Sequence, residues 1–320
     1  MSVLVYAENW EGNFRKGTFE AVWYAKQTAD LLGVELITFC SGNLEESELE
    51  KLIKFGSCKT LTATGLEKFD SRSLSSVMND IVNKYNVDTI IFSSTYTSKM
   101  TAPRLSIKIN SGIVNNVISL PKSADCFQLK KKVFSGKAFE LCEMSMSHKK
   151  IIMINPNSFS FTESQYDSSI VKENIEYNST EYIKVESKQK SSGKINLSEA
   201  EIIVSAGRGL KGPENWNMIE DLADLLGAAT ACSKPVSDIG WRPHSEHVGQ
   251  TGKAVAPNLY IAIGISGAIQ HLAGVNSSKT MVVINTDPEA PFFKAADYGI
   301  IGDAFEIVPK LINEIKHLNN

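Results

Sequence analysis

The stretch richest in candidate site residues lies between positions 247 and 274, in the run HVGQTGKAVAPNLYIAIGISGAIQHLAG. A glycine-flanked turn at 249–253 precedes an apolar strand, a second glycine turn and a histidine, His271, on an expected helix. Glycine lets the backbone approach a phosphate group, and a helix N-terminus presents free N–H groups and positive potential to an anion. The stretch therefore predicts a cleft that holds an anionic cofactor.

The turn at 249–253 resembles the end of the phosphate-binding loop of ATPases but lacks two of its parts. No glycine stands five positions before Gly252, and Ala254 occupies the position of the magnesium-binding Ser or Thr. ATP hydrolysis is therefore disfavoured. The turn can still direct the polar side chains of Gln250 and Thr251 into a cleft.

Two strand ends in the C-terminal part are each followed by a glycine turn. After EIIVSAG, Arg208 stands between Gly207 and Gly209, which fits either a plain surface turn or an anion contact. After NLYIAIGI, Ser266 is expected to cap the next helix, and the small residues behind it leave room for a diphosphate. His271 follows Ser266 by about one and a half helical turns, so it is expected to line the same cleft.

Other reactive residue types form no recognisable site. His244 and His247 make an HxxH pair, but no third ligand accompanies them, so no metal site is expected. The five cysteines are scattered without a CxxC pair, which predicts buried thiols in a reducing cytosol and neither disulfides nor structural zinc. No Ser-His-Asp or Cys-His signature is present. The net charge of −3 gives no electrostatic reason to expect nucleic acid or an anionic membrane as partner.

The order of apolar and amphipathic runs predicts two α/β domains. Up to about position 110, strand-like and helical runs alternate, which predicts a doubly wound, mostly parallel sheet. Between about 112 and 184, consecutive strand-like runs predict antiparallel or mixed strands added to that sheet. The polar run at 186–200 predicts a linker, and a second α/β alternation with a smaller parallel sheet follows it. We therefore expect domains at 1–190 and 196–320.

The first of these domains carries no cofactor motif. Its first strand is followed by NWEGNFRKG, which contains neither a GxGxxG fingerprint nor a phosphate loop, so no dinucleotide site is expected there. The N-terminus lacks a signal-peptide pattern, and the longest apolar run, 259–272, is too short to span a bilayer. The chain is therefore expected to be cytoplasmic, without membrane insertion.

Three runs of the C-terminal domain resemble the FAD-binding half of the electron-transfer flavoprotein alpha subunit. They are SAGRGLKG, VGQTGKAVAPNLYIAIGISGAIQHLAG and INTDPEAPFFKAADYGIIGD, and the likeness is ordered and nearly continuous from 204 to about 309. The N-terminal domain agrees more loosely, in its length and in its order of strands and helices. The resemblance implies an electron carrier of bacterial type that holds one FAD in an extended cleft and turns over no substrate.

The resemblance also implies which residues contact FAD. Contacts to the diphosphate, ribose, adenine and neighbouring parts would come from Arg208, Ser266, Gly267, Ala268, Ile269, Gln270, His271, Asn285, Asp303 and Ala304. The isoalloxazine would be lined by Ser233, Lys234, Val248, Gly249, Gln250 and Thr251. Thr251 would lie close to flavin N5 and His271 near the N1–C2=O edge, where a histidine donor stabilises the negative charge that develops on reduction.

One residue departs from the family pattern. Most relatives carry arginine at the position of Lys234, where it lies over the flavin ring and favours reduced forms. Lysine keeps the charge but loses the planar, stackable guanidinium. Lys234, Thr251 and His271 are thus expected to tune the redox potential, and no catalytic residue is needed because the cofactor supplies the chemistry.

The family works as a heterodimer, which implies a partner for this chain. A beta subunit would complete the shell around FAD and carry an AMP. Electrons would come from acyl-CoA dehydrogenases and related flavoenzymes of fatty acid β-oxidation and pass to a membrane quinone oxidoreductase. The FAD domain must swing between partners, and the linker at 186–200 would suit a hinge.

Three alternatives remain open from the sequence. An electron-bifurcating or nitrogen-fixation-associated form of the same family would take electrons from NADH through a second FAD in the partner subunit. An NAD-dependent dehydrogenase would need the fingerprint that is missing after the first strand. A nucleotide-binding stress or signalling module, based on the N-terminal domain, would bind adenine nucleotides without flavin.

Overall fold

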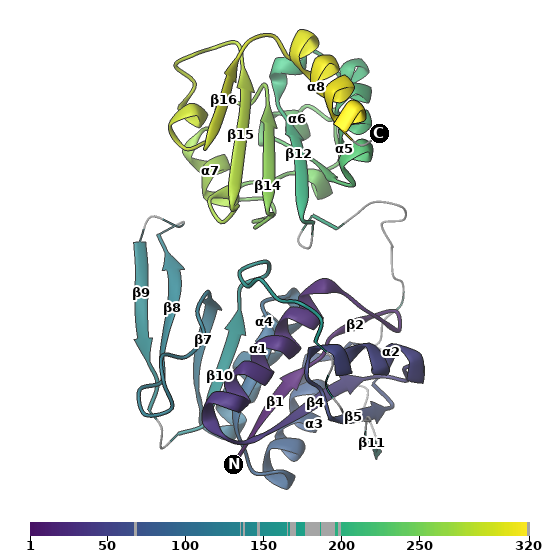
Figure 1. Ribbon diagram of the computed structural model, residues 1–320, viewed down its shortest axis with the longest axis vertical. Helices are drawn as coiled ribbons and strands as arrows, with labels where there is room; N and C mark the ends of the chain where they lie inside the picture. The colour runs from purple at the N-terminus through teal and green to yellow at the C-terminus, as the bar shows by residue number, and fades with distance from the viewer. Residues whose placement is uncertain are drawn as a thin grey trace. The chain divides into compact units, whose positions relative to one another are not determined.

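The computed structural model describes residues 1–66, 69–134, 136, 138–145, 148–164, 166, 171–176, 186, 196–197 and 200–318. The chain divides into two compact units, the first with Met1–Val133 and Lys137–Gln189, the second with Lys190–Asn320 and Phe134–Gly136 (Figure 1). Each unit has its own sheet and its own apolar core. The linker predicted at 186–200 lies almost entirely outside the described residues.

The sheet of the first unit contains nine strands among the described residues, in the order β11-β5-β4-β1-β6-β10-β7-β8-β9. The strands from β11 to β7 run parallel, whereas the pairs β7-β8 and β8-β9 are antiparallel. The predicted mostly parallel sheet with added antiparallel strands is therefore confirmed. The strands are β1 (Ser2–Tyr6), β4 (Glu35–Ser41), β5 (Lys59–Thr64), β6 (Val87–Ser93), β7 (Gly112–Val117), β8 (Gln128–Val133), β9 (Ala138–Glu143), β10 (Lys150–Ile154) and β11 (Val171–Glu176).

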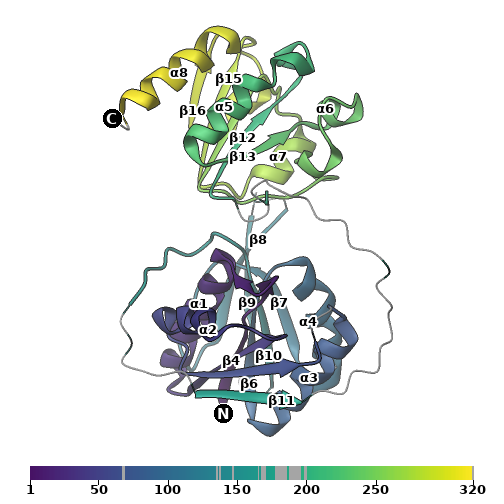
Figure 2. The same ribbon diagram turned by 90° about the vertical axis from the view of Figure 1, so that its right-hand side faces the viewer.

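Helices cover both faces of this sheet (Figure 2). On one face lie α1 (Lys16–Leu32), α2 (Glu46–Glu50) and the 3-10 turn η1 (Lys51–Phe55), and on the other lie α3 (Ser71–Lys84) and α4 (Tyr96–Ile109). Side chains alternate along β1: Val3 and Val5 pack in the α1 core, and Leu4 and Tyr6 in the α3/α4 core. A small antiparallel pair, β2 (Asn9–Trp10) and β3 (Asn13–Phe14), follows β1 and was not predicted.

β10 occupies a place that the sequence did not reveal. It was predicted as a further member of the strand series after position 112, but it inserts between β6 and β7 and runs parallel to both. All five residues of β10 are buried, as expected for a strand covered by helices on both faces. Which strands become neighbours depends on packing between distant segments, so the local apolar pattern could not predict it.

The second unit has a five-stranded parallel sheet in the order β13-β12-β14-β15-β16. The helices α5 (Asn217–Leu226) and α8 (Ala304–Leu318) pack on one face, and α7 (Ile269–Val275) lies on the other (Figure 2). The short strands β13 and β16 were not predicted. The strands are β12 (Ile202–Ala206), β13 (Ala229–Cys232), β14 (Leu259–Ile263), β15 (Thr280–Asn285) and β16 (Tyr298–Ile301).

Glycines end two of the helices. Gly33 and Gly227 adopt left-handed conformations, with φ of 65° and 60°, directly after α1 and α5. A left-handed residue ends a helix by turning its N–H back to the last carbonyls, and glycine adopts it without steric cost. Among the described residues, no helix combines the length and apolar content that crossing a bilayer requires.

The cysteines are all free thiols, but only two of them are buried. Cys40 and Cys232 lie in the two cores, in agreement with the prediction. Cys58 is exposed, and Cys126 and Cys142 are partly exposed, so the expectation of buried thiols was wrong for these three. Their spacing in the sequence carries no information on burial, which the folded chain decides.

Candidate functional site

The residues proposed to hold a cofactor follow the carboxyl ends of the five parallel strands of the second sheet. Arg208 follows β12, Ser233 and Lys234 follow β13, and the segment 266–271 follows β14. Asn285 ends β15, and 303–304 follows β16. Because the strands are parallel, their carboxyl ends form one edge. The chain goes from β12 outward to β13 and then returns to the other side of β12 with β14, and ligands of open α/β sheets bind at such a switch point.

The turn 248–251 is hydrogen-bonded to α7, but the chain does not continue from the turn into a helix. The N–H of Gln250 donates to the carbonyl of Gln270 over 2.7 Å, and the N–H of Val255 donates to the carbonyl of Gly274 over 2.8 Å. The motif is thus a turn docked on α7, which agrees with the argument that it is no phosphate loop of the ATPase type.

The same turn is tied to the strands behind it. The N–H of Val248 donates to the carbonyl of Cys232 at 3.0 Å, and the N–H of Ser233 donates to the carbonyl of Ala206 at 3.1 Å. Ser233 precedes the short helix α6 (Lys234–Asp238) and is buried, whereas Lys234 is exposed. The structure therefore brings the end of β13 and the turn 248–251 together, although some 15 residues separate them in the sequence.

The glycines on either side of Arg208 allow the turn after β12 to pack directly against the turn after β14. A Cβ atom on Gly207 would lie 2.2 Å from the carbonyl oxygen of Gly264, and one on Gly209 would lie 2.6 Å from its Cα. The turns after β12 and β14 therefore cross with no room for side chains. Arg208 itself, in the 3-10 turn η2 (Arg208–Leu210), is exposed at this crossing and free to meet an anion at the carboxyl edge.

Ser266 does not cap a helix, which corrects the prediction made from its residue type. α7 begins at Ile269, its N-cap residue is Ala268, and no side chain caps it. Gly267 separates Ser266 from the helix with a φ of 83°, which bends the chain. The serine carbonyl instead accepts a hydrogen bond of 3.1 Å from the N–H of Phe292. The side chain of Ser266 is exposed together with Ala268, Ile269 and Gln270.

His271 lies on the inner side of α7 and is 7% exposed. Its Nε2 atom is 2.9 Å from the hydroxyl of Tyr260 on β14. Burial, and then the neighbouring His247, lower the pKa of His271 to about 4, while the backbone of Val248, which lies close to the ring but outside hydrogen-bonding geometry for Nδ1, raises it. The ring is therefore neutral at pH 7. Its Nδ1 atom is buried and has no hydrogen-bond partner among the described residues.

A buried polar nitrogen without a partner costs free energy unless a ligand or water satisfies it. The Nδ1 atom of His271 is such an atom, and it belongs to a residue that sits directly beside the turn 248–251. A neutral imidazole can donate one hydrogen bond and accept another. The ring thus offers a cofactor one polar group, as the FAD resemblance requires.

His247 is a second buried histidine at the base of the turn, with 2% of its surface exposed. Its ring centre lies 5.2 Å from that of His244, and its Nδ1 also lacks a hydrogen-bond partner among the described residues. Burial, followed by the charges of His244 and Lys234, lowers the pKa of His247. No group of three or more His, Cys, Asp or Glu side chains among the described residues could hold a metal ion.

Asn285 and Asp303 already have partners within the chain. The amide of Asn285 donates to the carbonyl of Ile265 at 3.0 Å and accepts from the N–H of Asp287 at 3.1 Å. The carboxylate of Asp303 accepts a hydrogen bond of 3.0 Å from the N–H of Phe305. This bond lowers the pKa of the Asp303 carboxyl below its ordinary value and caps the start of α8. Ala304 is the buried first residue of that helix. These residues shape the edge, and each retains further hydrogen-bonding capacity except Ala304.

A charged cluster that the sequence did not reveal anchors the segment before the turn. Arg242 makes two hydrogen bonds to Glu246, of 2.7 and 2.8 Å, and an ion pair of 3.0 Å with Glu220 on α5. Its guanidinium lies over the ring of Trp216, 5.2 Å from the centroid. Spacing alone could have suggested the Arg242–Glu246 pair at i and i+4, but the contacts to α5 depend on the tertiary fold.

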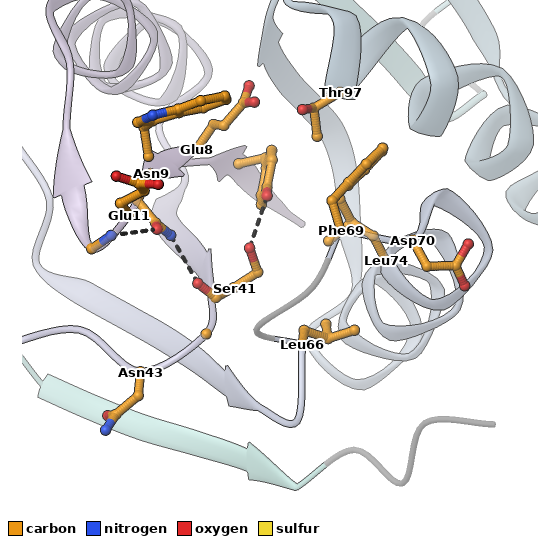
Figure 3. Close-up of a pocket in the computed structure, with 14 residues that line it drawn as sticks. Glu8, Asn9, Glu11, Ser41, Asn43, Leu66, Phe69, Asp70, Leu74 and Thr97 are labelled. Carbon is orange, nitrogen blue, oxygen red and sulfur yellow. Dashed lines mark hydrogen bonds between the residues drawn. The ribbon is translucent and has the colours of Figure 1, made fainter. Parts of the chain in front are cut away.

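A cleft of about 320 Å³ lies in the first unit, at the carboxyl ends of β1, β4 and β5 (Figure 3). Its described lining includes the carboxylates of Glu8, Glu11 and Asp70 but no Lys or Arg side chain. Asp70 caps α3 itself, by accepting hydrogen bonds from the first N–H groups of that helix. In the described part of the cleft, a nucleotide phosphate would therefore find no basic side chain, and the first N–H groups of α3 are already bonded to Asp70.

Models of two protein families match the chain. The electron transfer flavoprotein domain matches residues 3–183, and the electron transfer flavoprotein FAD-binding domain matches residues 196–276. Electron transfer flavoprotein subunit alpha of Bacillus subtilis is 39% identical, over 99% of this chain and 98% of its own length. The protein of that name from Thermoanaerobacterium thermosaccharolyticum is 33% identical, over 99% and 98%. Protein FixB of Clostridium saccharobutylicum is 30% identical, over 99% and 96%. This chain therefore belongs to the electron transfer flavoprotein alpha subunit family.

Proposed function

We propose that this chain is the FAD-binding alpha subunit of a heterodimeric electron carrier and turns over no substrate of its own. It accepts electrons in the cytoplasm from acyl-CoA dehydrogenases and related flavoenzymes of fatty acid β-oxidation, and it passes them to a quinone oxidoreductase. The observation that carries this proposal is the buried, unpaired Nδ1 atom of His271 beside the turn 248–251, in a chain whose second unit matches an FAD-binding family.

The carboxyl edge of the second sheet fits FAD chemically. FAD, when bound, supplies the electron transfer, so the protein has to bind it, orient it and set its potential. The exposed guanidinium of Arg208 suits a diphosphate, and the unpaired Nδ1 of His271 suits a carbonyl or ring nitrogen of the flavin.

The residues of the edge divide into two groups in this proposal. The diphosphate, ribose and adenine side is held by Arg208, Ser266, Gly267, Ala268, Ile269, Gln270, Asn285, Asp303 and Ala304. The flavin side is held by Ser233, Lys234, Val248, Gly249, Gln250, Thr251 and His271.

The two units take different tasks in this proposal. The second, from 196 to 320, binds FAD, and the first, from 1 to 190, contacts an electron transfer flavoprotein beta subunit that carries an AMP. The division of the chain into two compact units supports this separation.

The visible spectrum of the chain co-expressed with its beta subunit tests the proposal. We expect flavin absorption, one FAD and one AMP per heterodimer, and reduction by an acyl-CoA dehydrogenase with its substrate. A colourless complex that binds nicotinamide or adenine nucleotides alone would contradict FAD binding. A flavin that acyl-CoA dehydrogenases fail to reduce would contradict the donor but not the cofactor.

An electron-bifurcating function is the second candidate, because Protein FixB of Clostridium saccharobutylicum is 30% identical over 99% of this chain. Such a carrier takes electrons from NADH through a second FAD in its partner. The same purified heterodimer distinguishes the two functions: two FAD per heterodimer and reduction by NADH favour bifurcation, whereas one FAD with AMP and no reaction with NADH favours the simple carrier.

A further inference from the structure

We propose that Tyr260 is a positioning residue of the flavin site, whose hydroxyl holds Nε2 of His271 so that the ring offers Nδ1–H to the cofactor. The proposal rests on the proposed function, since it assigns a task to a residue behind the FAD site. Tyr260 would act only through His271 and would itself remain out of contact with the flavin.

Two buried polar groups, the hydroxyl of Ser205 and the imidazole of His271, lie near the hydroxyl of Tyr260. The residue lies in β14, between β12 and β15, with Ile203 and Met281 as its register neighbours. Its side chain is fully buried in the apolar core on the α7 face of the sheet. A buried phenol must find a hydrogen-bond partner, because its desolvation is otherwise uncompensated. Nε2 of His271 supplies that partner at 2.9 Å.

Phe292 holds both rings in place. Its ring stacks on that of Tyr260, with centroids 6.4 Å apart and planes inclined by 8°, and it lies 5.9 Å from the His271 ring at 57°. Gly267 allows this approach, because a Cβ atom there would stand 2.6 Å from the backbone nitrogen of Phe292. The imidazole thus packs beside both aromatic rings, with its centroid 6.1 Å from that of Tyr260, and the hydrogen bond to Tyr260 engages Nε2 and leaves Nδ1.

In our proposal the Tyr260 hydroxyl donates to Nε2, which sets the tautomer of His271. His247 is the titratable group beside the His271 ring from the turn 248–251, and Cys232 on β13 is the one near Tyr260. Burial raises the pKa of the Tyr260 hydroxyl and lowers that of His271, so both groups are neutral at pH 7. A neutral phenol that donates to Nε2 leaves the ring hydrogen on Nδ1. That nitrogen is the one without a partner.

The substitution Tyr260→Phe tests the proposal in the FAD-containing heterodimer, because it removes the hydroxyl and keeps the stacked ring. We expect full FAD content and a midpoint potential lower than that of the wild type, since Nδ1–H is no longer aimed at the charge that develops on reduction. The substitution Tyr24→Phe is the matched control. Tyr24 is equally buried and donates to the carbonyl of Ser119 at 3.0 Å in the first unit, so its loss should leave the potential unchanged.

A double-variant cycle separates a positioning task from a general structural one. In the background of His271→Ala, the further change Tyr260→Phe should leave the potential where His271→Ala puts it. An equal shift in both backgrounds, or no shift in either, would overturn the proposal. A wild-type heterodimer that contains no FAD would instead contradict the proposed function. Failure of this proposal and failure of the proposed function are therefore distinguishable.

Nitrogen-15 NMR of histidine-labelled chain in the wild-type heterodimer gives a reading that needs no Tyr260 variant. The His271 signals are assigned as those absent from His271→Ala. We expect the Nδ1–H tautomer, and the Tyr260→Phe spectrum should show a mixture of both tautomers. A pure Nε2–H tautomer in the wild type would rule out the proposal even if Tyr260→Phe failed to fold.

Discussion

Gly274 of α7 stands so close to the turn 248–251 that a Cβ atom at Gly274 would lie 2.5 Å from the Cα atom of Gly249. The atoms of Gly249 that this Cβ atom would meet all belong to the backbone, which cannot rotate away as a side chain can. Gly249 itself has a φ of 153°, a conformation that other residues rarely adopt. The turn and the helix that carry Thr251 and His271 therefore hold each other in place through two glycines.

The substitution Gly274→Ala should weaken FAD binding. Alanine in a helix is ordinarily favoured over glycine by about 1 kcal/mol, but here the methyl group must displace the turn. Such overpacking costs about 1–3 kcal/mol, which leaves a net cost of up to about 2 kcal/mol, so we expect FAD affinity to fall by up to about thirtyfold. Titration of the FAD-depleted heterodimer measures it. Gly17→Ala in α1 is the control, because its Cβ atom would meet only the Ser93 hydroxyl oxygen, at 3.4 Å. Equal affinities in both variants would show that the contact does not hold the site.

The substitution Lys234→Ala should retain FAD and lower its midpoint potential. The ammonium group follows β13 and favours added negative charge on a flavin held at the same edge. An exposed charge contributes about 1 kcal/mol or less, which corresponds to roughly 20 mV in a two-electron couple. Spectroelectrochemistry measures the change. Lys279→Ala is the matched control, since this exposed lysine precedes β15 and lies at the opposite edge of the sheet. An unchanged potential would remove Lys234 from the set of tuning residues.

The substitution Arg242→Ala should destabilise the second unit by roughly 2–3 kcal/mol. The change leaves the carboxylate of Glu246 buried without its two hydrogen bonds, and loss of one partner of a largely buried pair costs several kcal/mol. Arg242→Lys keeps the charge but not the paired geometry, so it should lose less. Urea unfolding monitored by tryptophan fluorescence measures both. Equal stabilities of Arg242→Ala and the wild type would show that the cluster does not anchor the segment.

The stability of the second unit should fall as the pH drops below about 6.5. Burial lowers the pKa of His271 from 6.5 to about 4, so the unfolded chain binds more protons between these values. Stability is therefore present above pH 6.5 and is lost as the pH falls toward 4, by about 2 kcal/mol at pH 5. His271→Gln removes this contribution and should flatten the pH dependence by the same amount. Unfolding free energies of the wild type and of His271→Gln, measured at pH 5 and pH 7, test this prediction. An equal pH dependence in the two proteins would contradict the burial of a neutral His271 ring.

The turn, strand and helix around the candidate site could be predicted because they are neighbours in the sequence. The turn at 249–253, β14 and α7 follow one another within one run, and an apolar strand between glycine turns has few other interpretations. The expectation that Ser266 caps the helix was wrong because Gly267 bends the chain before α7 begins. Residue type favours a cap, but the backbone conformation at the next residue decides whether the helix starts there.

Local sequence patterns were enough to predict the two α/β units, the parallel second sheet and the glycine turns and polar residues that follow its strands. Periodicity and glycine turns are local properties, so a single chain reveals them. Three contacts became visible in the folded chain alone: β10 inserts between β6 and β7, Arg242 pairs with Glu220 on α5, and Tyr260 contacts His271. These contacts join segments that the sequence does not place side by side, and each follows from the need to bury apolar surface and to pair most buried polar groups.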